Sequence, residues 1–471
     1  MNKRIITLIL GPVFFLLCLF LLPESVFSTL QARAAIGVVV WTAFWWVTSP
    51  VDFAVTAMVP VCVNALIGMA PMSSVIANYA SETIVLLFSA SVLTAVWAET
   101  GLDRRISAKI LSLIGEKMRT QVAFWFILCA LLSAVIPNAV VCAAIVPIAV
   151  SMLGYVGEKD IRQSSKGSLI LLTIVYAIGV GGLLTPLGGA MNLVITDYLT
   201  QVTGQEYMFA SWIVRFAPIF AILVISNILL LFIFCKKTDT LPGSREFFIE
   251  EYKKMPPMKK EEIISLVLFI IATVLSFTRN LYQGILPGLK PAYAFAVCAL
   301  LSFVFTRKDG KRLIEWKNAQ NKVVWEMMFV FAGGLALGTL INESGAADMI
   351  GEAVAKANLT GGFGTVFIIV LLTVLLSDVT SNTATASVVT PIVISIISGI
   401  GENPIPYIYI TAIGINLSYL LPTSIRAIPV GYGLKPNYML KKGIIFEIVA
   451  IVLMTLVGYF LLKYWPLFST I

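Results

Sequence analysis

Residues 377–391 read SDVTSNTATASVVTP, and residues 133–147, which lie 244 positions earlier, read SAVIPNAVVCAAIVP. Both stretches have Ser first, Asn sixth and Pro last. The same offset pairs other residues along the chain: Glu82 with Glu326, Glu99 with Glu343, and Gly101 with Gly345. One offset that fits all of these positions indicates an internal duplication. Polar segments inside an apolar chain mark the functional regions of membrane proteins.

The composition is that of a polytopic membrane protein. Of the 471 residues, 59% are hydrophobic and only 12% are charged, about half the charged fraction of soluble domains. Histidine is absent, which excludes a His-ligated metal and a histidine base. The six cysteines lack CxxC spacing and are expected to be free thiols. The net charge of +8 is attributed to loops that face anionic lipid, so no nucleic-acid partner is expected.

The hydropathy pattern predicts an all-α fold of about eleven transmembrane helices and two re-entrant hairpins. The hairpins are expected near 122–154 and 363–399, where polar motifs interrupt apolar runs. The first apolar run is interpreted as a retained span, with a signal peptide as the minor alternative. The spans are expected near 5–22, 34–48, 51–71, 78–98, 168–200, 212–235, 263–278, 292–306, 324–341, 406–434 and 443–463.

Loop charge predicts the orientation. With a cytoplasmic N-terminus, the inside loops near 104–119, 159–166, 236–260, 307–322 and 435–442 are all rich in Lys and Arg. The outside segments then hold only Arg33, Arg279, Lys290, Lys356 and, in the C-terminal tail, Lys463. An odd number of spans separates the two hairpins, so they open from opposite sides. Such inverted repeats allow one central site to face either side in turn.

The hairpin tips carry the groups that suit an anion site. Ser381, Asn382 and Thr383 can donate hydrogen bonds to carboxylates, and their oxygens can coordinate Na⁺. Helix N-termini exposed at a hairpin tip also attract anions. Hydroxyls can instead have a structural role, by bonding the backbone of their own helix or by holding neighbouring helices together. For Ser387 and Thr390 we favour this structural role.

At these motifs the chain resembles the divalent anion/sodium symporter family, the INDY-type carboxylate transporters. The resemblance is clearest over residues 81–433 and rests on the duplicated Ser-Asn-Thr motif. It implies a homodimer in which a transport domain moves like an elevator against a scaffold domain. The implied scaffold comprises residues 1–121, including an interfacial arm, and 236–345. The implied transport domain comprises 122–235, with the first hairpin and broken helix, and 346–471, with the second hairpin, broken helix and last helix.

The resemblance also implies a substrate site at the hairpin tips and at two broken-helix loops, although the match is uneven. The second tip keeps the whole triplet, whereas Pro137 and Ala139 flank Asn138 in the first. The implied substrate-binding residues are Pro137, Asn138, Ala139, Gly188, Gly189, Ser381, Asn382, Thr383, Ser424, Ile425 and Arg426. Na⁺ sites are implied at Ser377, Thr380, Asn382 and Ser424 and, in weakened form, at Ser133, Asn138 and Gly188.

Arg426 is a charged residue within a predicted span, which makes it a functional candidate. We predict that its guanidinium replaces Na⁺ in facing the substrate carboxylate, with snorkelling to the inner surface or pairing with Glu447 as the alternatives. A fixed cation favours obligatory exchange, because the empty carrier would have to move an unpaired charge.

The resemblance implies dicarboxylates of four or five carbons as substrates, such as succinate, malate, fumarate or 2-oxoglutarate, with citrate or tartrate as alternatives. Together with Arg426 it predicts that the protein exchanges them. A Na⁺-coupled dicarboxylate symporter is the alternative, and an anion channel a more distant one. No cofactor is expected, and Na⁺ is allowed but not required. No nucleophile–base pair points to an enzyme. The expected location is the plasma (inner) membrane, with the N-terminus cytoplasmic and the C-terminus outside.

Overall fold

The computed structural model describes residues 3–236, 238–307, 310–356 and 361–471. Lys237 and Lys308, which contribute to the basic inside loops, lie outside these ranges. Within them the chain is helical and forms no strand, only two isolated bridges. The longer helices are α1 (Lys3–Leu21), α2 (Leu30–Thr48), α4 (Val59–Ile67), α6 (Glu82–Thr100), α7 (Leu102–Leu111), α8 (Met118–Ser133), α9 (Asn138–Tyr155), α10 (Ser165–Gly182), α11 (Ala190–Thr203), α12 (Phe209–Ile233), α13 (Ser244–Lys254), α14 (Lys260–Phe277), α16 (Pro291–Val304), α18 (Trp325–Glu343), α19 (Ala346–Lys356), α20 (Phe363–Val379), α21 (Asn382–Gly399), α22 (Ile405–Ile415) and α24 (Pro436–Tyr464).

The predicted all-α polytopic fold is confirmed. Nine helical segments among the described residues are long and apolar enough to cross a membrane. They include α9 and α21, the second legs of the two predicted hairpins. Three predicted spans are divided into shorter helices, and two of them, 168–200 and 406–434, are the segments in which the resemblance implied broken helices. The segment 51–71 divides into α3 (Phe53–Thr56) and α4, 168–200 into α10 and α11, and 406–434 into α22 and the short helices η3 (Ser424–Arg426) and α23 (Ala427–Gly431).

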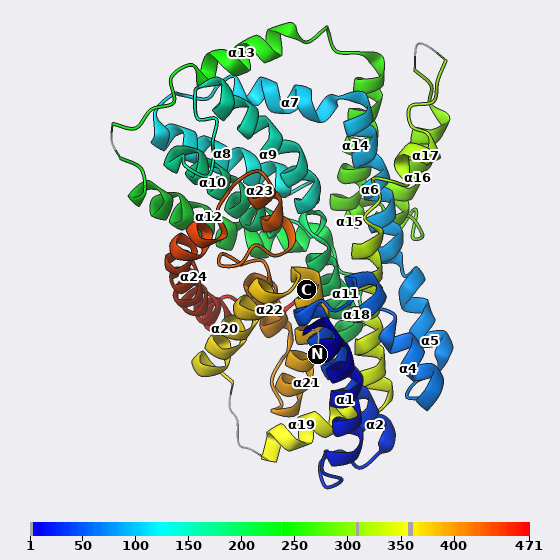
Figure 1. Ribbon diagram of the computed structural model, residues 1–471. Helices are drawn as coiled ribbons and strands as arrows, with labels where there is room; N and C mark the ends of the chain where they lie inside the picture. The colour runs from blue at the N-terminus through cyan, green and yellow to red at the C-terminus, as the bar shows by residue number, and fades with distance from the viewer. Residues whose placement is uncertain (1–2, 237, 308–309, 357–360) are drawn as a thin grey trace.

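Each predicted hairpin forms two helices joined by a short turn. The first is α8 and α9, and the second is α20 and α21. Their surroundings match as the duplication predicts, because α8 packs along α10 and α20 packs along α22. Figure 1 shows α8, α9 and α10 in the upper half of the view and α20, α21 and α22 in the lower half. The two hairpins, each with its neighbouring helix, therefore form two related halves of the molecule.

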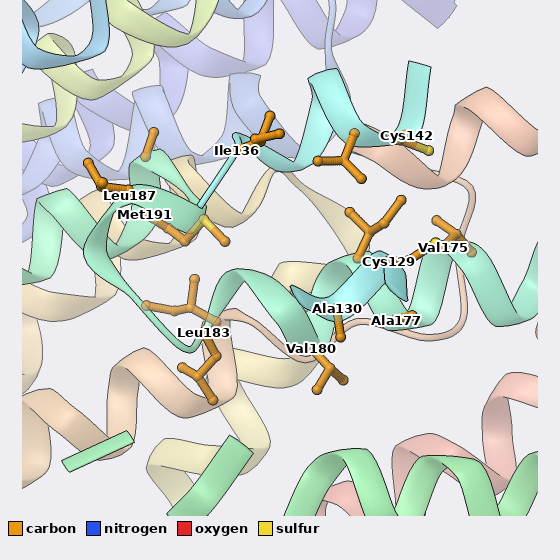
Figure 2. Close-up of a cluster of buried hydrophobic side chains, with 14 of the residues drawn as sticks. Cys129, Ala130, Ile136, Cys142, Val175, Ala177, Val180, Leu183, Leu187 and Met191 are labelled. Carbon is orange, nitrogen blue, oxygen red and sulfur yellow. The ribbon is translucent and has the colours of Figure 1, made fainter. Parts of the chain in front are cut away.

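The first hairpin rests on a close-packed apolar cluster. Figure 2 shows Cys129 and Ala130 of α8 beside Val175 and Val180 of α10, with Leu187 and Met191 from the next segment nearby. Most of the side chains in this cluster are almost completely buried. Burial of this kind contributes about 25 cal/mol for each Å² of apolar surface removed from its surroundings, although lipid lowers that gain. The cluster fixes where the first tip lies.

Helix α18 packs closely against the second hairpin through glycine. A Cβ on Gly334 would overlap the side chain of Ser387 on α21, so this close approach requires glycine. The hydroxyl of Tyr198 on α11 also donates to the Gly334 carbonyl, at 3.4 Å. Ser387 and Thr390 have no hydrogen-bond partner among the described residues, so they do not bond their helix backbone; of the two structural roles expected, Ser387 is left with helix–helix contact, at Gly334.

Candidate functional site

The two hairpin tips and the two broken-helix loops meet at one cavity of about 380 Å³. That volume is at the lower end of the range for small-molecule sites. Its lining comes from segments far apart in the sequence: the first tip (Pro137, Asn138, Ala139), the first loop (Gly189, Ala190, Met191), the second tip (Val379, Thr380, Ser381, Asn382, Thr383), the second loop (Thr423, Ser424, Ile425, Ile428), and Ser49, Phe53, Glu326, Met327 and Val330.

Three long helices begin at this cavity. Helix α9 starts at Asn138, α11 at Ala190 and α21 at Asn382, and all three residues line it. The amides of a helix's first turn have no partner within the helix, and the helix dipole adds partial positive charge there. The cavity thus has anion-attracting character without a basic side chain.

The second tip gathers oxygen atoms behind this lining. The Ser377 hydroxyl donates to Asn382 Oδ1 at 3.0 Å and to the carbonyl of Ile415 at 2.6 Å. The Ser418 hydroxyl lies 3.4 Å from the same Asn382 oxygen. At the start of α21, the Ser381 side chain accepts from the amide of Ala384 and caps the helix. Hydroxyl, amide and carbonyl oxygens of this kind fit a small hard cation such as Na⁺.

The first tip repeats the core of this arrangement with fewer polar atoms. The Ser133 hydroxyl donates to Asn138 Oδ1 at 2.6 Å and to the carbonyl of Ile178 at 3.0 Å. Gly182 leaves room for the asparagine, since a Cβ there would lie 2.7 Å from Asn138 Oδ1. The residue before α9 is Pro137, and its side chain makes no capping bond. The serine–asparagine pair is thus present twice, but only the second tip has hydroxyls on both sides of it.

Arg426 lies behind the cavity wall and not in its lining. Its side chain is 4% exposed and donates to the carbonyls of Leu421 (2.6 Å), Ser418 (3.1 Å) and Ser377 (3.3 Å). It also donates to the Thr423 hydroxyl at 2.6 Å.

The charge of Arg426 has its own counterion. Arg426 Nη2 is 3.8 Å from Oδ1 of Asp378, which is 2% exposed. Asp378 in turn accepts from the amide of Leu420 at 3.0 Å. The guanidinium therefore joins the second hairpin to the second loop. Arg426 does not line the cavity, and its ion pair is with Asp378, while the Glu447 carboxyl is close enough to interact electrostatically with both residues. Its predicted role in facing the substrate stays a prediction.

Three further predicted residues lie in or beside the cavity wall. Ser424 lines the cavity with a left-handed backbone (φ 52°), which is uncommon for a residue other than glycine and is found at functional sites. Gly188 is absent from the lining, but a Cβ on it would lie 2.8 Å from the Ser133 carbonyl, so it stands beside the first oxygen cluster. Thr380 lines the cavity, and its hydroxyl approaches the Trp46 carbonyl at 3.5 Å.

The sequence did not identify the part of the lining that comes from α2, α3 and α18. Ser49, Phe53 and Met327 carry no motif, and Glu326 was singled out only as the repeat partner of Glu82. Asp378 was also missed, although an acidic residue inside an apolar segment is a signal that could have revealed it. Asp378 follows directly after Ser377, in the stretch that defines the duplication.

Comparisons with known proteins agree with this geometry. A protein family described as citrate transporter (CitMHS) matches residues 43–414. A sodium-dependent dicarboxylate transporter, SdcS, of Staphylococcus saprophyticus is 26% identical, covering 97% of this chain and 91% of that protein. SdcS of Staphylococcus aureus is also 26% identical, over 98% of this chain.

A solved structure supports the fold. The YdaH transporter of Alcanivorax borkumensis aligns with a TM-score of 0.54 at 14% identity, covering 84% of this chain and 88% of its own. The family match spans most of the chain, so the protein is a multi-pass membrane transporter and not an enzyme. The chain belongs to the citrate transporter family, as its resemblance to the divalent anion/sodium symporters predicted.

Proposed function

We propose that the protein carries dicarboxylates of four or five carbons, such as succinate, malate, fumarate or 2-oxoglutarate, together with Na⁺. One observation carries this proposal: the described lining of the cavity contains no lysine or arginine, and its one ionisable side chain is acidic Glu326. A dianion in this place needs positive charge from another source. Helix N-termini supply part of it, and co-bound cations supply the rest. The names of the staphylococcal relatives, sodium-dependent dicarboxylate transporters, agree with this proposal.

The two oxygen clusters are the proposed Na⁺ sites. At the second tip, Ser377 and Asn382 would contribute side-chain oxygens, and Ser418 is close enough to add a third. At the first tip, Ser133 and Asn138 would contribute. Neither cluster contains a carboxylate, which suits a monovalent ion better than Ca²⁺. In this role Na⁺ is a co-substrate that neutralises the dicarboxylate.

Obligatory exchange without Na⁺ is the second candidate. It is favoured by the first tip, where Pro137 and Ala139 lack the hydroxyls that flank Asn382 in the second. The stronger sequence argument for exchange was an unpaired Arg426 facing the substrate. The ion pair with Asp378 weakens that argument, because the guanidinium already has a counter-charge.

The proposed movement is an elevator-like displacement within each protomer of a homodimer. Both tips and both loops would belong to the transport domain, whereas Ser49, Phe53 and Glu326 would belong to the scaffold. The close approach of Gly334 to Ser387 supports sliding, since small residues let helix backbones pass closely. In the predicted orientation, Ser49 and Glu326 stand at the cytoplasmic ends of their helices. The cavity would then face inward.

The decisive experiment is uptake of labelled succinate into proteoliposomes of the purified protein. Vesicles that are empty or preloaded with unlabelled succinate are compared, each with an inward Na⁺ gradient and with a matched K⁺ gradient. We expect uptake into empty vesicles with the Na⁺ gradient only. Uptake restricted to preloaded vesicles and indifferent to Na⁺ would establish exchange and refute the coupling proposed here.

A further inference from the structure

Glu326 is an acidic residue in the wall of a cavity proposed to bind an anion. It lies in the first turn of α18 and is exposed, whereas Asn138 and Thr383 deeper in the lining are buried. Its carboxylate has no ion pair or hydrogen bond with any residue of the described ranges. A carboxylate with no described counter-charge at this mouth repels every anion that enters or leaves.

The duplication supplies a matched residue with a different environment. Glu82 occupies the equivalent position in the first turn of α6 and lines a separate cavity of about 290 Å³. Its carboxylate is ion-paired with Lys290 at 2.9 Å and lies 3.3 Å from the Tyr293 hydroxyl. The acid of the first repeat is therefore compensated by a neighbouring cation, whereas the acid of the second repeat has no such partner in the part of the chain that the structure describes.

We propose that Glu326 is a specificity-determining residue that selects anions by charge, favouring dianions over trianions such as citrate. This inference rests on the proposed dicarboxylate transport at the same cavity. The repulsion between a carboxylate and an anion grows with each unit of anion charge. At a separation of about 8 Å and an effective dielectric constant of about 40, each additional charge lowers affinity roughly fivefold.

The location of Glu326 limits when this repulsion acts. The other polar groups of the lining, apart from Ser49, belong to the hairpins and broken-helix loops, whereas Glu326 belongs to α18. In the proposed elevator movement the carboxylate would stay still while the site moves away from it. Repulsion would then weaken anion binding only at this mouth, where it assists release.

The test compares the two anions in the Glu326→Gln variant. Competition of citrate against labelled succinate is measured at the cytoplasmic face of the carrier, in inside-out oriented proteoliposomes with Na⁺ and both anions outside. The pH is mildly alkaline, so that citrate carries three charges. The ratio of the citrate to the succinate inhibition constant should fall about fivefold in E326Q. Glu326→Asp should keep the wild-type ratio, and Glu82→Gln, whose acid is paired with Lys290, should leave it unchanged.

An unchanged ratio in E326Q, or an equal fall in E82Q, overturns the proposal. If E326Q does not transport, calorimetric binding of the two anions to the purified, detergent-solubilised variant in Na⁺ gives the same ratio without turnover. The wild-type protein is measured first: if it neither transports nor binds succinate, the proposed function fails and the charge selectivity fails with it. If the wild-type protein transports succinate and E326Q has the wild-type ratio of citrate to succinate inhibition constants, only the selectivity role of Glu326 is refuted, and the proposed transport function stands.

Discussion

The two hairpin tips share the same hydrogen-bonded turn but differ in their polar side chains. In both, a serine donates to an asparagine five residues later and to a carbonyl of the neighbouring broken helix. In the second tip, Ser381 caps α21 and Thr383 adds a further hydroxyl, whereas the first tip offers Pro137 and Ala139. We infer that the serine–asparagine pair, present in both tips, maintains the shape of the turn. The hydroxyls of Ser381 and Thr383, present only in the second tip, would serve binding.

The supports behind the two tips differ as well. The first rests on the apolar cluster around Cys129 and Val180 (Figure 2). The second is tied to its broken-helix loop by the buried pair of Arg426 and Asp378. The same apolar cluster also includes Val370 and Val374 of the second hairpin, so we infer that packing holds both tips and that the charged pair is an additional tie at the second.

The largest effect is expected from Asn382→Ala. The asparagine lines the cavity and accepts from Ser377, so its loss removes a contact to the anion or its cation and also loosens the tip. Hydrogen bonds to charged groups contribute about 1.5–3 kcal/mol, so uptake should fall on the order of 100-fold. Labelled succinate uptake measures it, with size-exclusion chromatography to check that the variant remains folded. Asn138→Ala is the matched change, and equal transport by N382A and the wild type would remove the tip from the site.

The second-largest effect is expected from Arg426→Ala, which should lower the stability of the protein as well as its transport rate. It leaves Asp378 buried without its partner, at a cost on the order of 3 kcal/mol, and releases the second loop. We expect a clearly lower Tm in detergent and a fall of more than tenfold in the maximal uptake rate.

Arg426→Lys separates the two roles of this side chain. Lysine keeps the charge but not the planar set of donors, so an intermediate Tm is expected from the charged pair. A residue that merely contacted substrate would instead raise KM at an unchanged Tm. That outcome in R426A would support the original prediction of a substrate-facing cation.

Gly334→Ala should slow the carrier about tenfold without weakening succinate binding. The added methyl group would overlap Ser387 on α21, and overpacking of this kind costs about 1–3 kcal/mol. Initial uptake rates and the apparent KM measure the effect. The equivalent residue in the first repeat is Ala90, so Ala90→Gly is the matched control and should change the rate little. A wild-type rate in G334A would contradict sliding at this contact.

The smallest effect is expected from making the first tip resemble the second. Ala139→Thr restores one hydroxyl beside Asn138, and one neutral hydrogen bond contributes about 0.5–1.5 kcal/mol. The Na⁺ concentration for half-maximal uptake should therefore fall about threefold. Ala139→Val, which has a similar shape without the hydroxyl, is the control. The same shift in both variants would show that shape and not the hydroxyl is responsible.

Much of this molecule could be predicted from its sequence because the duplicated motifs are short and are related by one offset. The duplication located both hairpin tips, and nine of the eleven predicted substrate-site residues line the cavity. The placement of Arg426 could not be predicted, since its partner Asp378 lies 48 residues away and the contact depends on how the loop folds back. The roles of Ser49 and Glu326 were missed for a similar reason, because a cavity between packed helices leaves no sequence motif.

The Arg426–Asp378 pair also bears on electrical measurements of transport. In the proposed movement both residues travel together, so this pair adds no net charge to what crosses the membrane field. A reversal potential would then report the valence of the dicarboxylate and its co-ions without a correction for this arginine. Had the guanidinium been unpaired, each return stroke of the empty carrier would have produced its own voltage-dependent current.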